Sequence, residues 1–160
     1  KQLVKRQRKS GKVVDRRQSP KRGTILDVFH ELVYFTRVFP HRQLTLEVPL
    51  VEVEEWRYPG HGRRRRRRSG DFVIEDQKLL DFGDCHRFRR AGDLFNILPA
   101  DLPSPFGTSD LAELLTIDRW VAQRIAYCLR KTGAAKEVGK RGNAVLYEAK
   151  PATRRRKRAA

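Results

Sequence analysis

Apolar residues between residues 24 and 40 follow the spacing of one face of an α-helix. They recur at helical intervals from Ile25 to Phe39, and the segment is apolar enough to be well buried. Thr24 is suited to cap the start of this helix with its side-chain oxygen, and Pro40 is suited to end it. The pattern therefore predicts one buried helix between these two residues.

The segments that follow alternate between apolar and polar side chains, as half-buried strands do. Residues 44–56 alternate, with an irregularity expected at Pro49, and residues 71–75 alternate again. Two such strands close together in the chain favour an antiparallel β-hairpin. We expect residues 58–70 to form its tip.

Residues 91–98 predict a short helix, and Pro99, Pro103 and Pro105 follow it closely. Proline lacks the amide donor that helices and central strands require. We interpret the proline segment as the seam between two halves of the chain.

The sharpest local pattern, in residues 105–148, is a pair of helices joined by a short turn. A short helix is expected over residues 108–115, and its first two residues carry hydroxyl groups that can cap it. Residues 116–117 form the turn, and Asp118 caps a second helix that runs to about residue 131. Gly133 is suited to end this helix in the left-handed conformation.

The second helix divides into an apolar and a polar side at 100° per residue. The apolar side consists of Val121, Ala122, Ile125, Ala126, Cys128 and Leu129. The polar side consists of Arg119, Trp120, Gln123, Arg124, Tyr127, Arg130 and Lys131. Guanidinium and amide groups are what a helix in the major groove of DNA uses to contact base edges, so we expect the polar side to bind nucleic acid.

Two short strands follow, Ala134–Val138 and Ala144–Glu148, and a basic turn joins them. The order of two helices and a β-hairpin resembles the winged helix-turn-helix superfamily, over about 45 residues of this chain. The resemblance implies that helix 118–131 is the recognition helix. It also implies that three residues at the tip of the wing, Lys140, Arg141 and Asn143, lie beside a phosphate or the minor groove.

The net charge of +17 is concentrated in three segments. Residues 1–23 carry a net +9, residues 57–68 carry +7 and residues 150–158 carry +6, so the rest of the chain is mildly acidic. Blocks of like charge stay extended unless a polyanion neutralises them. Nucleic acid is the commonest polyanion of that kind, and acidic protein partners are the alternative. A membrane partner is not expected, because the chain has no long apolar run and no basic segment with an apolar face.

Arginine outnumbers lysine by more than two to one, and arginine binds phosphate bidentately. We expect the arginines of the loop and of the tail to bind phosphates. They are Arg63, Arg64, Arg65, Arg66, Arg67 and Arg68 in the loop and Arg154, Arg155 and Arg156 in the tail. For the loop, the alternative is a disordered segment without a ligand. The polar helix side has its own alternatives, a protein-docking surface or a merely solvated face.

No catalytic, metal or cofactor site is expected, because no phosphate loop, nucleophile elbow or metal-ligand spacing occurs. The four histidines and two cysteines form no ligand pattern. A group of carboxylates and one lysine on the predicted hairpin faintly resembles a metal-dependent nuclease site: Glu47, Glu52, Glu54, Glu55, Asp71, Glu75, Asp76 and Lys78. A solvated sheet face is the simpler interpretation of these residues.

The sequence thus predicts an α+β protein with four parts: a basic arm (1–23), a helix plus β-hairpin domain (24–104), a winged helix-turn-helix (105–149) and a basic tail (150–160). Its expected function is non-catalytic binding of nucleic acid, DNA in preference to RNA, inside the cell in the cytoplasm, nucleoid or nucleus. The alternatives are a metal-dependent nuclease with an attached binding domain and an assembly subunit whose winged helix docks protein. Because the chain contains no Met and starts at Lys1, we also expect it to be a fragment or a trimmed form of a longer chain. A larger protein assembly is a further expected partner.

Overall fold

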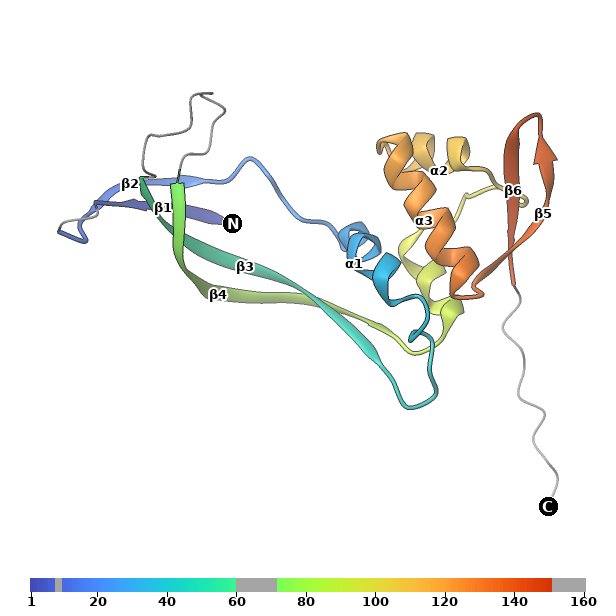
Figure 1. Ribbon diagram of the computed structural model, residues 1–160, viewed down its shortest axis with the longest axis horizontal. Coiled ribbons are helices and arrows are strands. Elements are labelled where there is room, and N and C mark those ends of the chain that lie inside the picture. The colour runs from blue at the N-terminus through green and yellow to red at the C-terminus, as the bar shows by residue number, and fades with distance from the viewer. Residues whose placement is uncertain (8–9, 60–71, 151–160) are drawn as a thin grey trace, which may run out of the picture. The chain divides into compact units, whose positions relative to one another are not determined.

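The computed structural model describes residues 1–7, 10–59 and 72–150, which form a mixed α+β protein (Figure 1). The chain divides into two compact units. We call residues 1–24 and 49–85 the sheet unit, and residues 25–48 and 86–160 the helical unit.

Four strands form one sheet in the order β2-β1-β3-β4. They are β1 (Gln2–Arg6), β2 (Val13–Gln18), β3 (Leu46–Pro59) and β4 (Phe72–Phe88). Strand β1 pairs antiparallel with β2 and parallel with β3. Side-chain contacts between β3 and β4 pair residue 58 with residue 75 and residue 47 with residue 87, so these two strands run antiparallel. The predicted hairpin is confirmed, and both strands are longer than the alternation indicated.

Residues 1–23 were expected to be an extended arm, and that expectation was wrong. Strand β1 buries Leu3 and Val4 against the sheet, and β2 pairs along its outer edge. Charge repulsion does not keep this segment out of the folded sheet, because β3 places carboxylates beside it. Lys1 forms an ion pair with Glu55, and Arg16 lies 3.6 Å from Glu54.

Glu55 is the most deeply buried charged residue of the described sheet unit, with 1% of its surface exposed. It accepts hydrogen bonds from Arg57 and from Gln77, in addition to its ion pair with Lys1. Burial raises the pKa of this carboxyl, but the three donors outweigh burial and hold the pKa below its ordinary value. The basic residues next to the carboxylates of β3 are therefore part of the sheet's structure.

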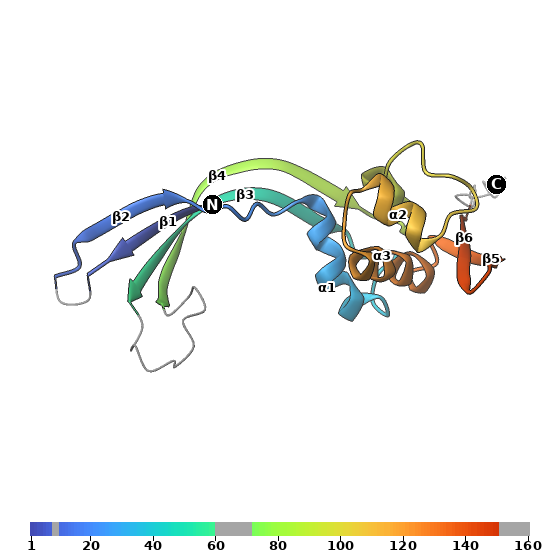
Figure 2. The ribbon, with the colours of Figure 1, turned by 90° about the horizontal axis from the view of Figure 1, so that it is seen from above.

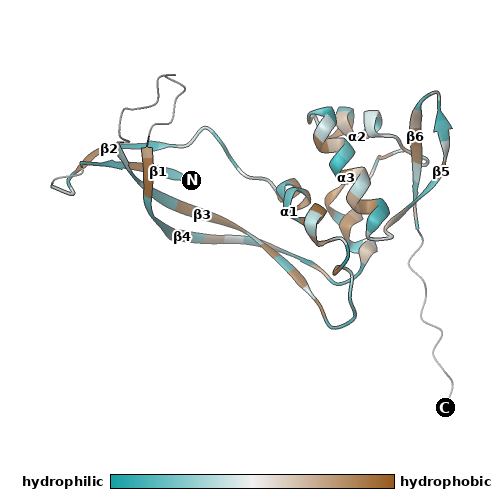
Figure 3. Cartoon of the chain, in the orientation of Figure 1, coloured by the Kyte–Doolittle hydropathy of each residue, from teal (hydrophilic) through white to brown (hydrophobic). Residues whose placement is uncertain are grey.

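The sheet unit leaves many apolar side chains in solvent, and Figure 3 shows hydrophobic stretches along β3 and β4. Val51 in β3 is exposed, and so are all residues of β4 from position 72 to position 85, including Leu79 and Phe82. In the described residues this unit has little apolar core, since Leu3 and Val4 are its buried apolar residues.

The first helix of the helical unit is shorter than predicted. A 3₁₀ turn, η1 (Ile25–Asp27), precedes α1 (Val28–Phe35), so the N-cap position is Asp27 and not Thr24. After α1 the amides of Val38 and Phe39 both donate to the carbonyl of Phe35, which turns the chain before Pro40 is reached.

The remaining elements agree with the predicted order. They are η2 (Ala91–Ile97), α2 (Thr108–Leu114), α3 (Arg119–Lys131), β5 (Ala135–Arg141) and β6 (Ala144–Ala149), with β5 and β6 antiparallel. Figure 2 shows the helices and the β5–β6 hairpin of this unit from above.

The turn between α2 and α3 has a defined geometry. Thr116 adopts a left-handed conformation, with φ of 51°. The amide of Ile117 donates to the carbonyl of Ala112, and the amide of Thr116 donates to the carbonyl of Glu113. This is the Schellman pattern of helix termination, and it lets α3 begin after Asp118.

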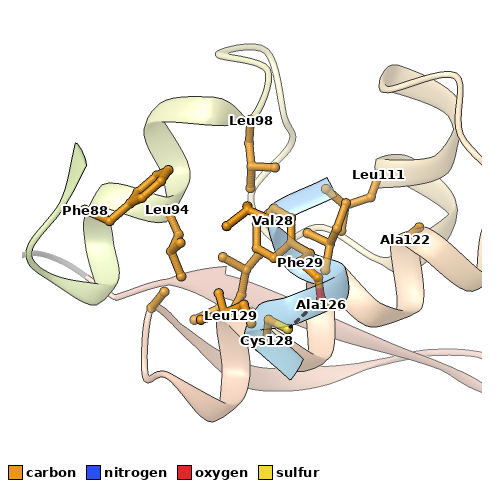
Figure 4. Close-up of a cluster of buried hydrophobic side chains, with 14 of the residues drawn as sticks. Val28, Phe29, Phe88, Leu94, Leu98, Leu111, Ala122, Ala126, Cys128 and Leu129 are labelled. Atoms are coloured by element: carbon orange, nitrogen blue, oxygen red, sulfur yellow. Dashed lines mark hydrogen bonds between the residues drawn. The ribbon is translucent and has the colours of Figure 1, made fainter. Parts of the chain in front are cut away.

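One apolar core joins α1, η2, α2 and α3 (Figure 4). Phe29 and Leu129 are fully buried in it, and the thiol of Cys128 lies 3.8 Å from the carbonyl oxygen of Phe29. Burial raises the pKa of that thiol to about 11. Because α1 packs in this core, the expected boundary between residues 104 and 105 does not separate the units: α1 belongs with α2 and α3.

Candidate nucleic-acid interface

Helix α3 presents two chemically distinct sides, as predicted. Ala122, Ile125, Ala126, Cys128 and Leu129 are buried, and Val121 is half-buried. On the other side Arg119, Gln123, Arg130 and Lys131 are exposed. The apolar periodicity orients the helix, because the core can accept only one of its sides.

Two residues of the predicted polar side contact α1. The ring of Trp120 lies 5.3 Å from the ring of His30, and Arg124 donates a hydrogen bond to Nδ1 of His30. The guanidinium of Arg124 also lies 5.2 Å from the centre of the Trp120 ring. Arg124 is half-buried as a result, whereas 52% of Trp120 remains exposed.

The contact with His30 could not be found from the apolar pattern. His30 lies between the buried Phe29 and the exposed Glu31, at a flank of α1 that periodicity leaves undefined. Its role depends on packing between helices that are remote in the sequence.

The C-terminal part of the polar side is partly engaged in intramolecular contacts. Arg130 forms an ion pair of 2.7 Å with Glu137 at the start of β5. The ammonium of Lys131 lies 5.7 Å from the ring of Tyr127, which is 38% exposed. Tyr127 and Lys131 therefore offer one mixed aromatic and cationic surface.

The β5–β6 hairpin carries Lys140, Arg141 and Asn143 at its turn, where Gly142 has a φ of 62°. Lys140 and Asn143 are exposed. Arg141 differs, because its Nη2 lies 2.8 Å from the carboxylate of Asp110 in α2.

Asp110 holds the hairpin and the start of α2 together. Its carboxylate accepts a hydrogen bond of 2.6 Å from the amide of Gly107, at the N-cap position. This backbone hydrogen bond lowers the pKa of Asp110, and the hydrogen bond from Arg141 adds to it against the opposing effect of burial. Arg141 thus positions the hairpin against α2.

The site residues divide into three groups. Arg119, Gln123, Lys140 and Asn143 are exposed and have no ion pair or side-chain hydrogen bond with another residue in the described part of the chain. A second group makes contacts with other residues of the unit, and it consists of Trp120, Arg124, Tyr127, Arg130, Lys131 and Arg141. Arg63 to Arg68 and Arg154 to Arg156 lie outside the described residues.

Residues 1–89 match a family model described as Domain of unknown function (DUF8091). The chain belongs to the DUF8091 family. The DUF8091 match includes the strands of the sheet unit and α1, whereas α2, α3, β5 and β6 lie outside it.

An uncharacterized protein of Treponema pallidum (strain Nichols) is 30% identical to this DUF8091 protein over 136 residues. The similarity covers 84% of this chain and 52% of the relative, so the chain spans about half the length of that relative. Because 84% of the chain exceeds residues 1–89, the similarity also extends into the helical unit beyond the DUF8091 match. No solved structure matches.

No group of three histidine, cysteine or acidic side chains within the described ranges could hold a metal ion. The carboxylates considered for a nuclease site include Glu54 and Glu55, and both contact basic side chains in the sheet. Among the helices of the described residues, none has the length and apolar character needed to span a membrane.

Proposed function

We propose that this protein binds nucleic acid without catalysis, DNA in preference to RNA, through a winged helix-turn-helix formed by α2, α3 and the β5–β6 hairpin. In this arrangement α3 is the recognition helix and β5–β6 is the wing. The observation that carries the proposal is the exposed polar side of α3, whose opposite side is fixed in the core.

Two side chains suit direct contact with bases. Arg119 and Gln123 lie on the first two turns of α3 and are exposed. The N-terminal residues of a recognition helix commonly contact base edges, where arginine pairs with guanine and glutamine with adenine. Lys140 and Asn143 at the wing then reach a phosphate or the minor groove.

Arg124 and Trp120 act in this proposal by positioning α3. Their contacts with His30 fix the helix on α1, so Arg124 contributes less to base contact than its place on the polar side suggests. Arg141 has the same role in the wing through Asp110.

Binding is tested with the full chain on duplex DNA of random and selected sequence, by fluorescence anisotropy. Arg119→Ala and Gln123→Ala should each lose about 1–3 kcal/mol on a selected site and much less on random duplex, since base contacts specify while phosphate contacts position. Arg42→Ala removes an exposed arginine away from α3 and serves as the matched control. Equal behaviour of the three variants would reject base contact by α3.

A protein-docking function is the second candidate, and the exposed aromatics of α3 favour it. Trp120 and Tyr127 are 52% and 38% exposed, and both residue types are enriched at interface hot spots. If Trp120→Ala and Tyr127→Ala abolish a protein complex while leaving affinity for every nucleic acid unchanged, α3 is a docking surface.

A further inference from the structure

The sheet unit contains a hollow of about 340 Å³ that the winged helix-turn-helix does not use. Residues of all four strands line it, including Lys5, Arg17, Arg57 and Phe72. Its volume falls within the range of about 300–1,000 Å³ that is typical of small-molecule sites.

Strand register brings the basic residues of the hollow together. Lys5 of β1 is the direct cross-strand neighbour of Arg57 of β3, and Arg17 of β2 is the neighbour of Leu3 of β1. Leu3 and Lys5 are two positions apart, so their side chains lie on the same face of the sheet. The buried Leu3 therefore lies among three cations from three adjacent strands.

Most of this positive charge is available to a ligand. Lys5 and Arg17 have no ion-pair partner within 4.0 Å in the described ranges, although Asp15 lies directly across from Lys5 and also lines the hollow. Arg57 uses its Nε on Glu55, and a guanidinium has further N–H donors. Three cations against one carboxylate leave the lining side chains with a net charge of +2.

An aromatic surface adjoins these cations. Phe72 is 37% exposed, and the guanidinium of Arg57 lies 3.8 Å from the centre of its ring. Tyr58 also lines the hollow, and its hydroxyl donates a 3.0 Å hydrogen bond to Glu75. The guanidinium of Arg57 covers one face of the Phe72 ring, so a base would stack on the opposite face, next to the cations that bind its phosphate.

We propose that this hollow binds a nucleotide of single-stranded nucleic acid, with the phosphate on Lys5, Arg17 and Arg57 and the base stacked on Phe72. The proposal rests on the proposed function in so far as the protein engages nucleic acid, but it assigns a second site, outside α3. The two sites would let one chain hold a duplex at α3 and a single strand on the sheet.

The test measures binding of the full chain to a fluorescent oligothymidylate and to an abasic sugar-phosphate strand of the same length. Phe72→Ala should weaken oligothymidylate binding at least about fivefold and leave abasic-strand binding unchanged, because stacking needs the base. Phe72→Tyr should retain wild-type affinity. Phe82→Ala, a change of the same kind at an exposed position of β4, is the matched control.

The double variant Lys5→Gln with Arg17→Gln should weaken binding of both strands and make the salt dependence shallower. The log–log slope should fall in magnitude by about 0.7 for each phosphate that the variant no longer neutralises. Lys12→Gln removes an exposed charge from the β1–β2 turn, outside the hollow, and should have no such effect. Melting curves of all variants establish that the sheet unit remains folded.

The outcomes separate this inference from the proposed function. If Phe72→Ala matches Phe82→Ala, or the double variant matches Lys12→Gln, the hollow is not the site, whatever the result with duplex DNA. Equal competition by polyglutamate at matched charge would also overturn nucleotide recognition. Loss of single-strand binding with unchanged duplex binding supports the second site, and failure to bind any nucleic acid rejects both proposals.

Discussion

The two units of this protein are stabilised differently. The helical unit has a continuous apolar core around Phe29 and Leu129, and its ion pairs, such as Arg130–Glu137, lie at the surface. The sheet unit has little apolar core in the described residues. It instead buries two carboxylates beside basic side chains: Glu54 lies next to Arg16, and Glu55 lies next to Lys1 and Arg57. An excess of basic residues in the sequence therefore does not by itself indicate a ligand-binding surface, because in the sheet unit several of these residues neutralise carboxylates within the fold.

The largest expected effect comes from placing a charge in the core of the helical unit. Leu129→Asp buries an unpaired carboxylate, and we expect it to destabilise the unit by about 4 kcal/mol or more. Lys131→Asp, two residues away on the exposed side of α3, should change stability much less. Urea unfolding followed by circular dichroism measures both. Similar losses in the two variants would contradict the assignment of the two sides.

An intermediate effect is expected in the sheet unit when its buried carboxylate is removed. Glu55→Ala leaves Lys1 and Arg57 without their shared partner, and we expect the free energy of unfolding to fall by about 2 kcal/mol. Breaking a fully buried ion pair typically costs about 3–5 kcal/mol. The loss is smaller here because both cations can reach water. Glu52→Ala, at an exposed position of β3, should lose less than about 0.5 kcal/mol. Hydrogen exchange at the amides of β1 provides the local measurement, and unchanged protection in Glu55→Ala would contradict the role of Glu55.

The smallest effect concerns the link between α2 and the hairpin. Asp110→Asn weakens the hydrogen bond to the Gly107 amide and removes the ion pair with Arg141, so we expect a loss of about 1 kcal/mol at neutral pH. The folded-state pKa of Asp110 lies below its ordinary value of 3.8, so its contribution is present above that pH and disappears as the pH falls through the folded value. The difference between wild type and variant should therefore shrink in acid. A difference that is constant with pH would show that the charge of Asp110 does not matter.

The sequence predicted the helical unit better than the sheet unit. The sides of α3, the turn before it and the left-handed Gly133 all follow from local periodicity and capping. Strands β1 and β2 could not be predicted in this way, because their pairing depends on carboxylates of β3, which is far along the chain. The local density of positive charge favoured an extended arm instead. For the same reason the positions of His30 beside Arg124 and of Asp110 beside Arg141 were missed, since each pair is far apart in the chain.

The central claim is that the protein binds nucleic acid, and the salt dependence of its affinity for duplex DNA tests that claim most directly. Several of the predicted cations are used within the fold, but Arg119, Lys131 and Lys140 are exposed on α3 and the β5–β6 hairpin. With at least two further contacts from the arginine segments, about five phosphates should be neutralised, which gives a log–log slope near −4.5 at about 0.9 per phosphate. A slope shallower than about −2, or no measurable binding at low salt, would contradict the claim.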